Sequence, residues 1–74
     1  MTSRESFFEC RYTSAVGVYE LQVRAWTASE AESLFRDALE ACGVTTPGAV
    51  VVVGPRGLVR RSSYAPAAQE VSAP

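Results

Sequence analysis

The stretch FFECRYTSAVGVYELQVRAW, residues 7–26, decides how this chain folds. Apolar and polar residues alternate through 7–13 and again through 18–26, which predicts two half-buried β-strands. Residues 14–17 (Ser-Ala-Val-Gly) end in glycine and supply a short turn between the two strands. The stretch therefore predicts an antiparallel hairpin.

The alternation also predicts the register of this hairpin. Closing the turn symmetrically sets Thr13 opposite Val18. The apolar face then carries the pairs Tyr12–Tyr19, Cys10–Leu21 and Phe8–Val23, with Ala25 beyond them. The polar face carries Arg11 opposite Glu20, an opposite-charge pair worth ~0.2–1 kcal/mol, and Phe7 opposite Arg24, which favours a cation–π contact. A slip of one residue would expose the aromatic side chains, so the register is strongly specified.

Residues 28–42 are predicted to form one helix. Thr27 and Ser29 each precede a glutamate by three positions, which gives two overlapping capping boxes. An apolar stripe recurs at spacings of three and four: Ala28, Ala31, Leu34, Phe35, Ala38, Leu39 and Cys42. The pairs Glu32–Arg36 and Arg36–Glu40 are expected on the solvent face, and Gly43 is expected to end the helix.

The remaining strands are predicted at 49–53 and 58–62. The run Ala-Val-Val-Val-Val at 49–53 does not alternate, so the strand is either buried on both faces or covered by a partner on its outer face. Residues 54–57 (Gly-Pro-Arg-Gly) read as a type I hairpin turn with a bulge at Gly57. The charged strand 58–62 suits a sheet edge, and residues 63–74 are expected to be a flexible tail.

The predicted fold class is α+β, with order ββαββ and a single helix packed on one face of a four-stranded sheet. Residues 1–62 would form one domain. This length and element order resemble β-grasp (ubiquitin-like) domains, although no motif carries the resemblance. The C-terminal Ser-Ala-Pro at 72–74 departs from the Gly-Gly tail of the conjugated or sulfur-carrier members, so their chemistry is not expected here. So small a domain buries little core, and association would add burial.

The composition excludes several function classes. The net charge is −1, and the chain lacks Lys, His, Ile and Asn, a bias typical of a high-GC bacterial genome. Without His or Lys, the usual general base, the commonest zinc ligand and Schiff-base chemistry are missing. We therefore expect no enzyme activity, no cofactor and no metal. The longest apolar run is far too short to span a bilayer, and no signal peptide is visible. A cytoplasmic protein follows, with Cys10 and Cys42 as free, packed thiols.

The polar face of the hairpin is the first candidate for partner binding. Phe7, Val18 and Trp26 lie there beside Arg11 and Arg24, and Trp and Arg are enriched in binding hot spots. Glu9 and Glu20 share this face and would repel phosphate, so the expected partner is another protein or a second copy of the chain. The alternative for Trp26 is a hydrophobic staple at the helix start.

The second candidate is a basic hairpin. Residues 1–40 carry four Arg against seven acids, whereas residues 41–74 carry three Arg against one acid. These three, Arg56, Arg60 and Arg61, would form a small basic patch, which gives the alternative function of weak, salt-dependent nucleic-acid binding. Charged protection of an edge strand explains the same residues.

Overall fold

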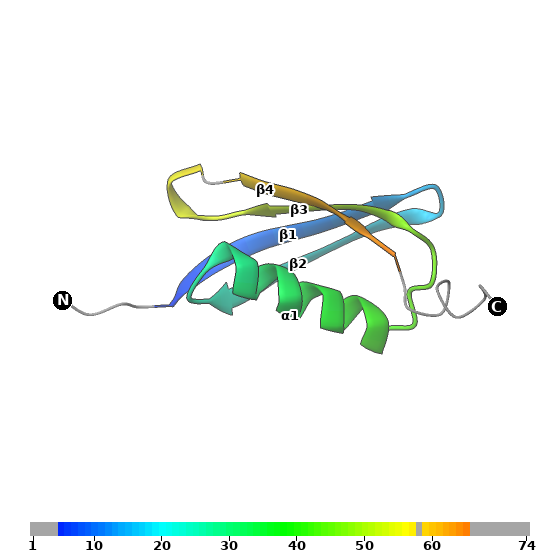
Figure 1. Cartoon of the computed structure of the whole chain (residues 1–74), viewed down its shortest axis with the longest axis horizontal. Helices are drawn as coiled ribbons and strands as arrows, with labels where there is room; N and C mark the ends of the chain where they lie inside the picture. The colour runs from blue at the N-terminus through cyan, green and yellow to red at the C-terminus, as the bar shows by residue number, and fades with distance from the viewer. Residues whose placement is uncertain (1–4, 58, 66–74) are drawn as a thin grey trace.

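The computed structural model describes residues 5–57 and 59–65. Its elements follow one another in the predicted order ββαββ (Figure 1). They are β1 (Ser6–Ser14), β2 (Gly17–Ala25), α1 (Ala28–Ala41), β3 (Gly48–Val53), the short 3-10 turn η1 (Pro55–Gly57) and β4 (Val59–Tyr64). The α+β fold class is confirmed.

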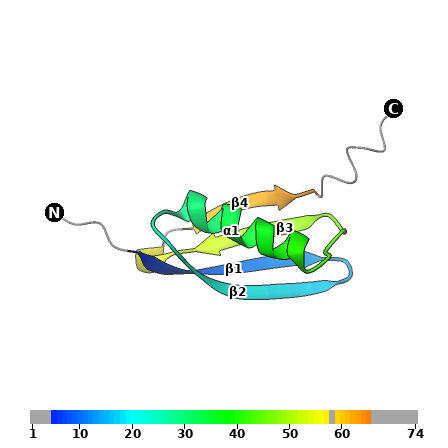
Figure 2. The same ribbon diagram turned by 90° about the horizontal axis from the view of Figure 1, so that it is seen from below.

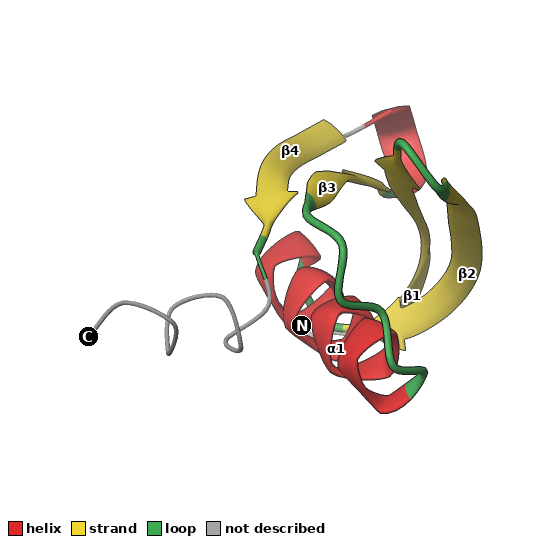
Figure 3. Ribbon diagram, turned by 90° about the vertical axis from the view of Figure 1, so that its right-hand side faces the viewer, coloured by secondary structure: helices red, strands yellow, loops and turns green. Residues whose placement is uncertain are grey.

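The four strands form one antiparallel sheet in the order β2-β1-β3-β4. β2 and β3 therefore run in the same direction with β1 between them, and α1 makes the crossing from one to the other. The helix lies across one face of the sheet (Figure 2), and the sheet curves around it with β2 and β4 on opposite sides of the helix (Figure 3). The resemblance to β-grasp domains remains a likeness in length and in the order of elements along the chain.

The predicted register of the first hairpin is confirmed at every pair, from Phe7↔Arg24 to Thr13↔Val18. Arg11 and Glu20 form an ion pair across the strands. The guanidinium carbon of Arg24 lies 5.2 Å from the centroid of the Phe7 ring. Alternation and a tight turn were sufficient to specify this part of the fold.

The core lies between the sheet and α1. It contains Phe8, Cys10, Tyr12, Val23, Ala25, Ala31, Phe35, Leu39, Val50, Val52 and Tyr64. Tyr64 is 1% exposed, and its ring packs edge-on against Tyr12 with 5.5 Å between centroids. β4 thus continues two residues beyond Ser62, so Ser63 and Tyr64 belong to the domain and not to the expected tail. Residues 66–74 of that tail lie outside the described residues.

Several residues expected in the core are exposed. Tyr19 and Leu21 are 45% and 46% exposed, Leu34 is 42% exposed, and Cys42 is also exposed. β2 is an edge strand, so its inner face has neighbours on one side only. Leu34 is exposed because the helix contacts the sheet through a narrower stripe than its apolar residues suggest. Cys42 is exposed because the helix ends at Ala41, which leaves Cys42 as the C-cap.

The second hairpin turn differs from the expected type I turn. Arg56 as well as Gly57 adopts a left-handed backbone, with φ values of 67° and 75°. That conformation costs a non-glycine residue about 1 kcal/mol. Pro55 begins a 3-10 turn here in place of the expected single bulge.

Among the residues that the structure describes, no helix is both long and apolar enough to cross a membrane.

Candidate protein interface

In the described part of the chain, no helix covers the sheet face turned away from α1. We call it the outer face. Its residues alternate with the buried ones along each strand: Phe7, Glu9, Arg11 and Thr13 (β1); Val18, Glu20, Gln22 and Arg24 (β2); Ala49, Val51 and Val53 (β3); Val59, Arg61 and Ser63 (β4). Phe7, Arg11, Val18 and Arg24 are therefore on one surface, as the sequence predicts.

Apolar side chains gather at one end of the outer face. Val53 pairs with Val59 on β4 and with Glu9 on β1, and Phe7 is the next outward residue along β1. Phe7 is 54% exposed and Val59 is 48% exposed, whereas Val51 and Val53 are half-buried. The Val run of β3 is thus covered on its inner face and open on its outer one.

Charges of both signs surround this apolar end. The Arg11 Nε donates to Glu20 Oε2 over 2.7 Å, and Arg24 lies 3.9 Å from the Glu5 carboxylate. Arg61 lies opposite Val51. An open hollow of about 580 Å³ is lined by Glu9, Arg11, Glu20, Gln22, Val51 and Val53, together with Cys10 and Leu21. The outer face therefore offers apolar contact area and paired charges in the same region.

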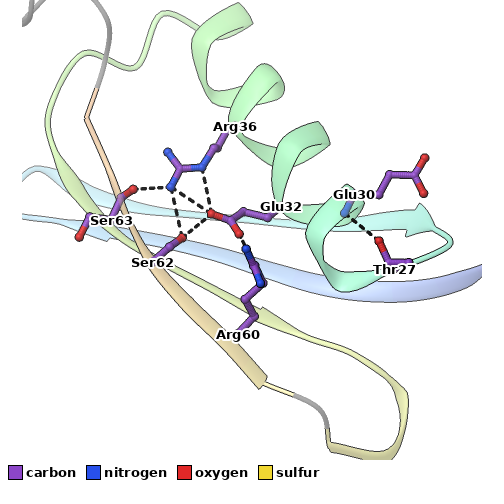
Figure 4. Close-up of polar contacts among 7 residues, drawn as sticks. All are labelled: Thr27, Glu30, Glu32, Arg36, Arg60, Ser62 and Ser63. Atoms are coloured by element: carbon purple, nitrogen blue, oxygen red, sulfur yellow. Dashed lines mark hydrogen bonds and ion pairs between the residues drawn. The ribbon is translucent and has the colours of Figure 1, made fainter.

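Trp26 lies between β2 and the helix. Its backbone N–H donates to Glu30 Oε1 over 2.8 Å, and the Thr27 hydroxyl accepts from the Glu30 N–H over 3.0 Å (Figure 4). The first predicted capping box thus forms, except that the Glu30 side chain accepts from the N–H of Trp26 and not from that of Thr27. Trp26 itself stays 51% exposed, so its side chain is open to a partner.

Glu32 does not lie on the solvent face where the sequence places it. It is 7% exposed and accepts hydrogen bonds from Arg60 Nε, from Ser62 Oγ at 2.6 Å and from Arg36 Nε at 3.1 Å (Figure 4). Arg36 also donates to Ser62 Oγ and to the Ser63 carbonyl. The second predicted capping box is replaced by a polar link between α1 and β4, which we call the Glu32 cluster.

This cluster separates the arginines of the predicted basic patch. Arg60 faces the helix and forms an ion pair with Glu32, whereas Arg61 is on the outer face and Arg56 is on η1. The structure does not bring Arg56, Arg60 and Arg61 to one surface. Adjacent residues of a strand point to opposite faces, and the sequence interpretation did not apply that rule to Arg60 and Arg61.

The pKa shifts of Cys10 and Glu32 follow from their burial and from the Glu32 cluster. Burial, reinforced by the negative charge of Glu32, raises the pKa of the Cys10 thiol to about 11. Hydrogen bonds from Ser62 and Arg60, and then from Arg36, lower the pKa of Glu32 to about 2 against the opposing effect of burial. In the described part of the chain, no three His, Cys, Asp or Glu side chains come together as metal ligands. The Glu32 cluster was not predicted from the sequence. The available signal was that Arg60, Ser62 and Tyr64 stand at every second position of β4 and therefore share one face of the strand.

Comparison of the chain with protein-family models, with curated proteins and with solved structures finds no match.

Proposed function

We propose that this protein is a small non-enzymatic interaction module that binds another protein through its outer face. The observation that carries the proposal is the exposed apolar end formed by Phe7, Val53 and Val59, with Arg24 against the Phe7 ring. Aromatic and arginine side chains are the residues that most often dominate binding energy at protein interfaces. The paired Arg11 and Glu20 would form part of a polar rim around the contact.

The charge pattern supports a protein partner over a nucleic acid. Arg11 is neutralised by Glu20, and Arg60 is neutralised by Glu32. Nucleic-acid affinity depends on several cations that can replace the counterions of phosphate. A mixed surface instead favours a partner whose own charges alternate. The proposal places the module in the cytoplasm, where Cys10 and Cys42 would stay reduced.

Affinity capture with an outer-face variant tests the proposal. The full-length chain is compared with a Phe7→Ala/Val59→Ser variant in capture from a cell extract, followed by direct binding measurements on any captured protein. The control is Val16→Ser, which removes an exposed apolar side chain in the turn of the first hairpin. We expect the outer-face variant to weaken binding at least tenfold while the control binds as the wild type does. Equal binding by all three chains would contradict the proposal.

A further inference from the structure

The outward edge of β2 is open over most of its length. The first six residues of β2, 17–22, are all exposed, and within the described residues no strand pairs with β2 on the side away from β1. An edge strand with free N–H and C=O groups can pair with another strand. The β2 edge is therefore a site where main-chain hydrogen bonds remain to be made.

The hairpin geometry identifies which residues carry these free groups. Ser14 and Gly17 close a two-residue turn, and in such a hairpin the closing pair exchanges main-chain hydrogen bonds, which then alternate along the strands. The main-chain groups of every second β2 residue therefore point away from β1. These residues are Val18, Glu20, Gln22 and Arg24.

Exposed apolar side chains flank this edge on both faces of the sheet. Tyr19 and Leu21 of β2 are half exposed on the helix side, and Val18 is exposed on the outer face. Arg36 reaches β4, and Leu34 lies two residues earlier, about 200° around the helix. Because β2 and β4 lie on opposite sides of α1 (Figure 3), Leu34 lies on the β2 side, where it is half exposed.

We propose that β2 pairs antiparallel with β2 of a second copy of this chain, about a two-fold axis at Gln22. This inference goes beyond the outer-face function and uses the main-chain edge of β2, although the side chains of Val18, Glu20 and Arg24 also belong to the outer face. The pairing joins two four-stranded sheets into one eight-stranded sheet. It is isologous, so each contact occurs twice.

Charge complementarity selects both the second copy and the register. With Gln22 opposite the partner's Gln22, Glu20 lies opposite the partner's Arg24, and the partner's Glu20 lies opposite Arg24. The neighbouring register about Glu20 would instead set two glutamates directly opposite each other, which is destabilising. Only even-numbered residues carry outward main-chain groups, and the register about Gln22 pairs even residues with even residues.

The same register covers the exposed apolar groups. Leu21 lies opposite the partner's Val23, and Tyr19 lies opposite the partner's Ala25. Val18 lies opposite the partner's Trp26 at each end of the pairing. The two helices then flank the axis on one face of the sheet, which brings Leu34 toward its equivalent in the partner.

The opposite edge of the sheet is less suited to this role. β4 is six residues long, against nine for β2. The outward residue at the centre of the β4 edge is the charged Arg61, whereas that of the β2 edge is the uncharged Gln22. The Ser63 carbonyl is occupied by Arg36. Short, charged and covered edges are those that resist strand addition. The two edges therefore provide a matched comparison within one molecule.

Sedimentation equilibrium of the full-length chain over a wide concentration range tests the pairing. We expect the wild type to approach twice its monomer mass of 7.9 kDa. Gln22→Pro removes an outward N–H without touching the hydrogen bonds to β1, and it should weaken dimerisation at least tenfold. The control Arg61→Pro places proline at the same point of the β4 edge and should leave the dimer intact. A wild type that stays monomeric, or a dimer lost in Arg61→Pro and kept in Gln22→Pro, overturns the proposal.

A charge exchange tests the register without proline. Glu20→Arg and Arg24→Glu should each weaken dimerisation, because each sets like charges opposite each other twice. The double variant Glu20→Arg/Arg24→Glu restores opposite charges between the two copies and should dimerise more tightly than either single variant, although it loses the Arg11–Glu20 ion pair within each chain. Failure of the double variant to recover, with its folded circular-dichroism spectrum intact, counts against this register.

Cross-linking locates the two-fold axis directly. In a Cys42→Ser background, Gln22→Cys should form an intermolecular disulfide, because hydrogen-bonded pairs have Cα atoms about 5.5 Å apart. Glu20→Cys should not, since its equivalent lies four residues away along the partner strand. Cross-linking at residue 20 instead of 22 overturns the register. A monomeric wild type that still binds a protein through Phe7 would overturn the dimer and leave the outer-face function standing.

Discussion

At the scale of single residues, Glu32 is the side chain that links the helix to the edge of the sheet. One of its hydrogen-bond donors, Arg36, is four residues further along α1, whereas Arg60 and Ser62 of β4 are 28 and 30 residues away in sequence. The buried carboxylate is therefore satisfied largely by a distant strand. A buried charge that loses its partners is costly. The ionisation of Glu32 should therefore be coupled to folding.

We expect the free energy of unfolding to fall in acid because of this one group. Its pKa in the folded protein, about 2, is below the ordinary value of 4.5, so the charged form is favoured by folding. The stabilisation is present above pH 4.5 and is lost as the pH falls from 4.5 towards 2, by roughly 1–3 kcal/mol. Urea unfolding at pH 7 and pH 3 measures it. Glu32→Gln should lower stability at pH 7 and flatten this pH dependence, whereas Asp37→Asn, an exposed acid-to-amide change on the same helix, should do neither.

The two thiols should differ in reactivity because only one is accessible. Cys42 is exposed, whereas Cys10 is buried, with a pKa of about 11 that keeps it protonated. The thiolate is the reactive form. We expect a thiol reagent at neutral pH to modify one cysteine in the folded protein and both in urea. Peptide mapping that finds Cys10 modified at the rate of Cys42 in the folded state would show that this core opens readily.

At the scale of elements, the last strand shows where sequence patterns stop being informative. The register of the first hairpin was predictable because apolar and polar positions alternate and the turn is short. β4 has two polar residues, Ser62 and Ser63, before Tyr64, so its pattern resembles the start of a tail. The Tyr64 hydroxyl donates to the Val44 carbonyl over 2.9 Å, a contact that depends on the path of the α1–β3 connection.

Truncation tests whether the domain ends at Ser62, as predicted from the sequence, or includes Tyr64, as in the structure. A chain of residues 1–65 should keep the stability of the full chain, because Tyr64 remains in the core. A chain of residues 1–62 loses that buried ring and should be destabilised by about 3–5 kcal/mol, as for removal of a core aromatic side chain. Urea unfolding followed by circular dichroism compares the three chains. Equal stability of 1–62 and 1–65 would mean that Tyr64 contributes little to the core.

At the scale of the whole molecule, the sheet's two faces divide the candidate residues. Phe7, Arg11, Val18 and Arg24 could be placed together from the sequence, because they share one hairpin whose register is fixed. Strand alternation alone separates Arg60 from Arg61, but which of the two lies on the outer face could not be known without the position of the helix. The Glu32 cluster depends on how α1 crosses the sheet, and this crossing is a property of the tertiary fold.

The proposed pairing of β2 would also make the stability of the whole molecule depend on concentration. A partner that binds the folded state and not the unfolded state adds to stability by mass action, and a domain of this size has little core of its own. We expect the melting temperature of the wild type to rise with protein concentration. Gln22→Pro should melt at a temperature that does not depend on concentration, whereas Arg61→Pro should behave as the wild type does. Differential scanning calorimetry at several concentrations measures this. A wild-type melting temperature that stays constant would indicate that the monomer's own core supplies its stability and that the β2 edge stays open.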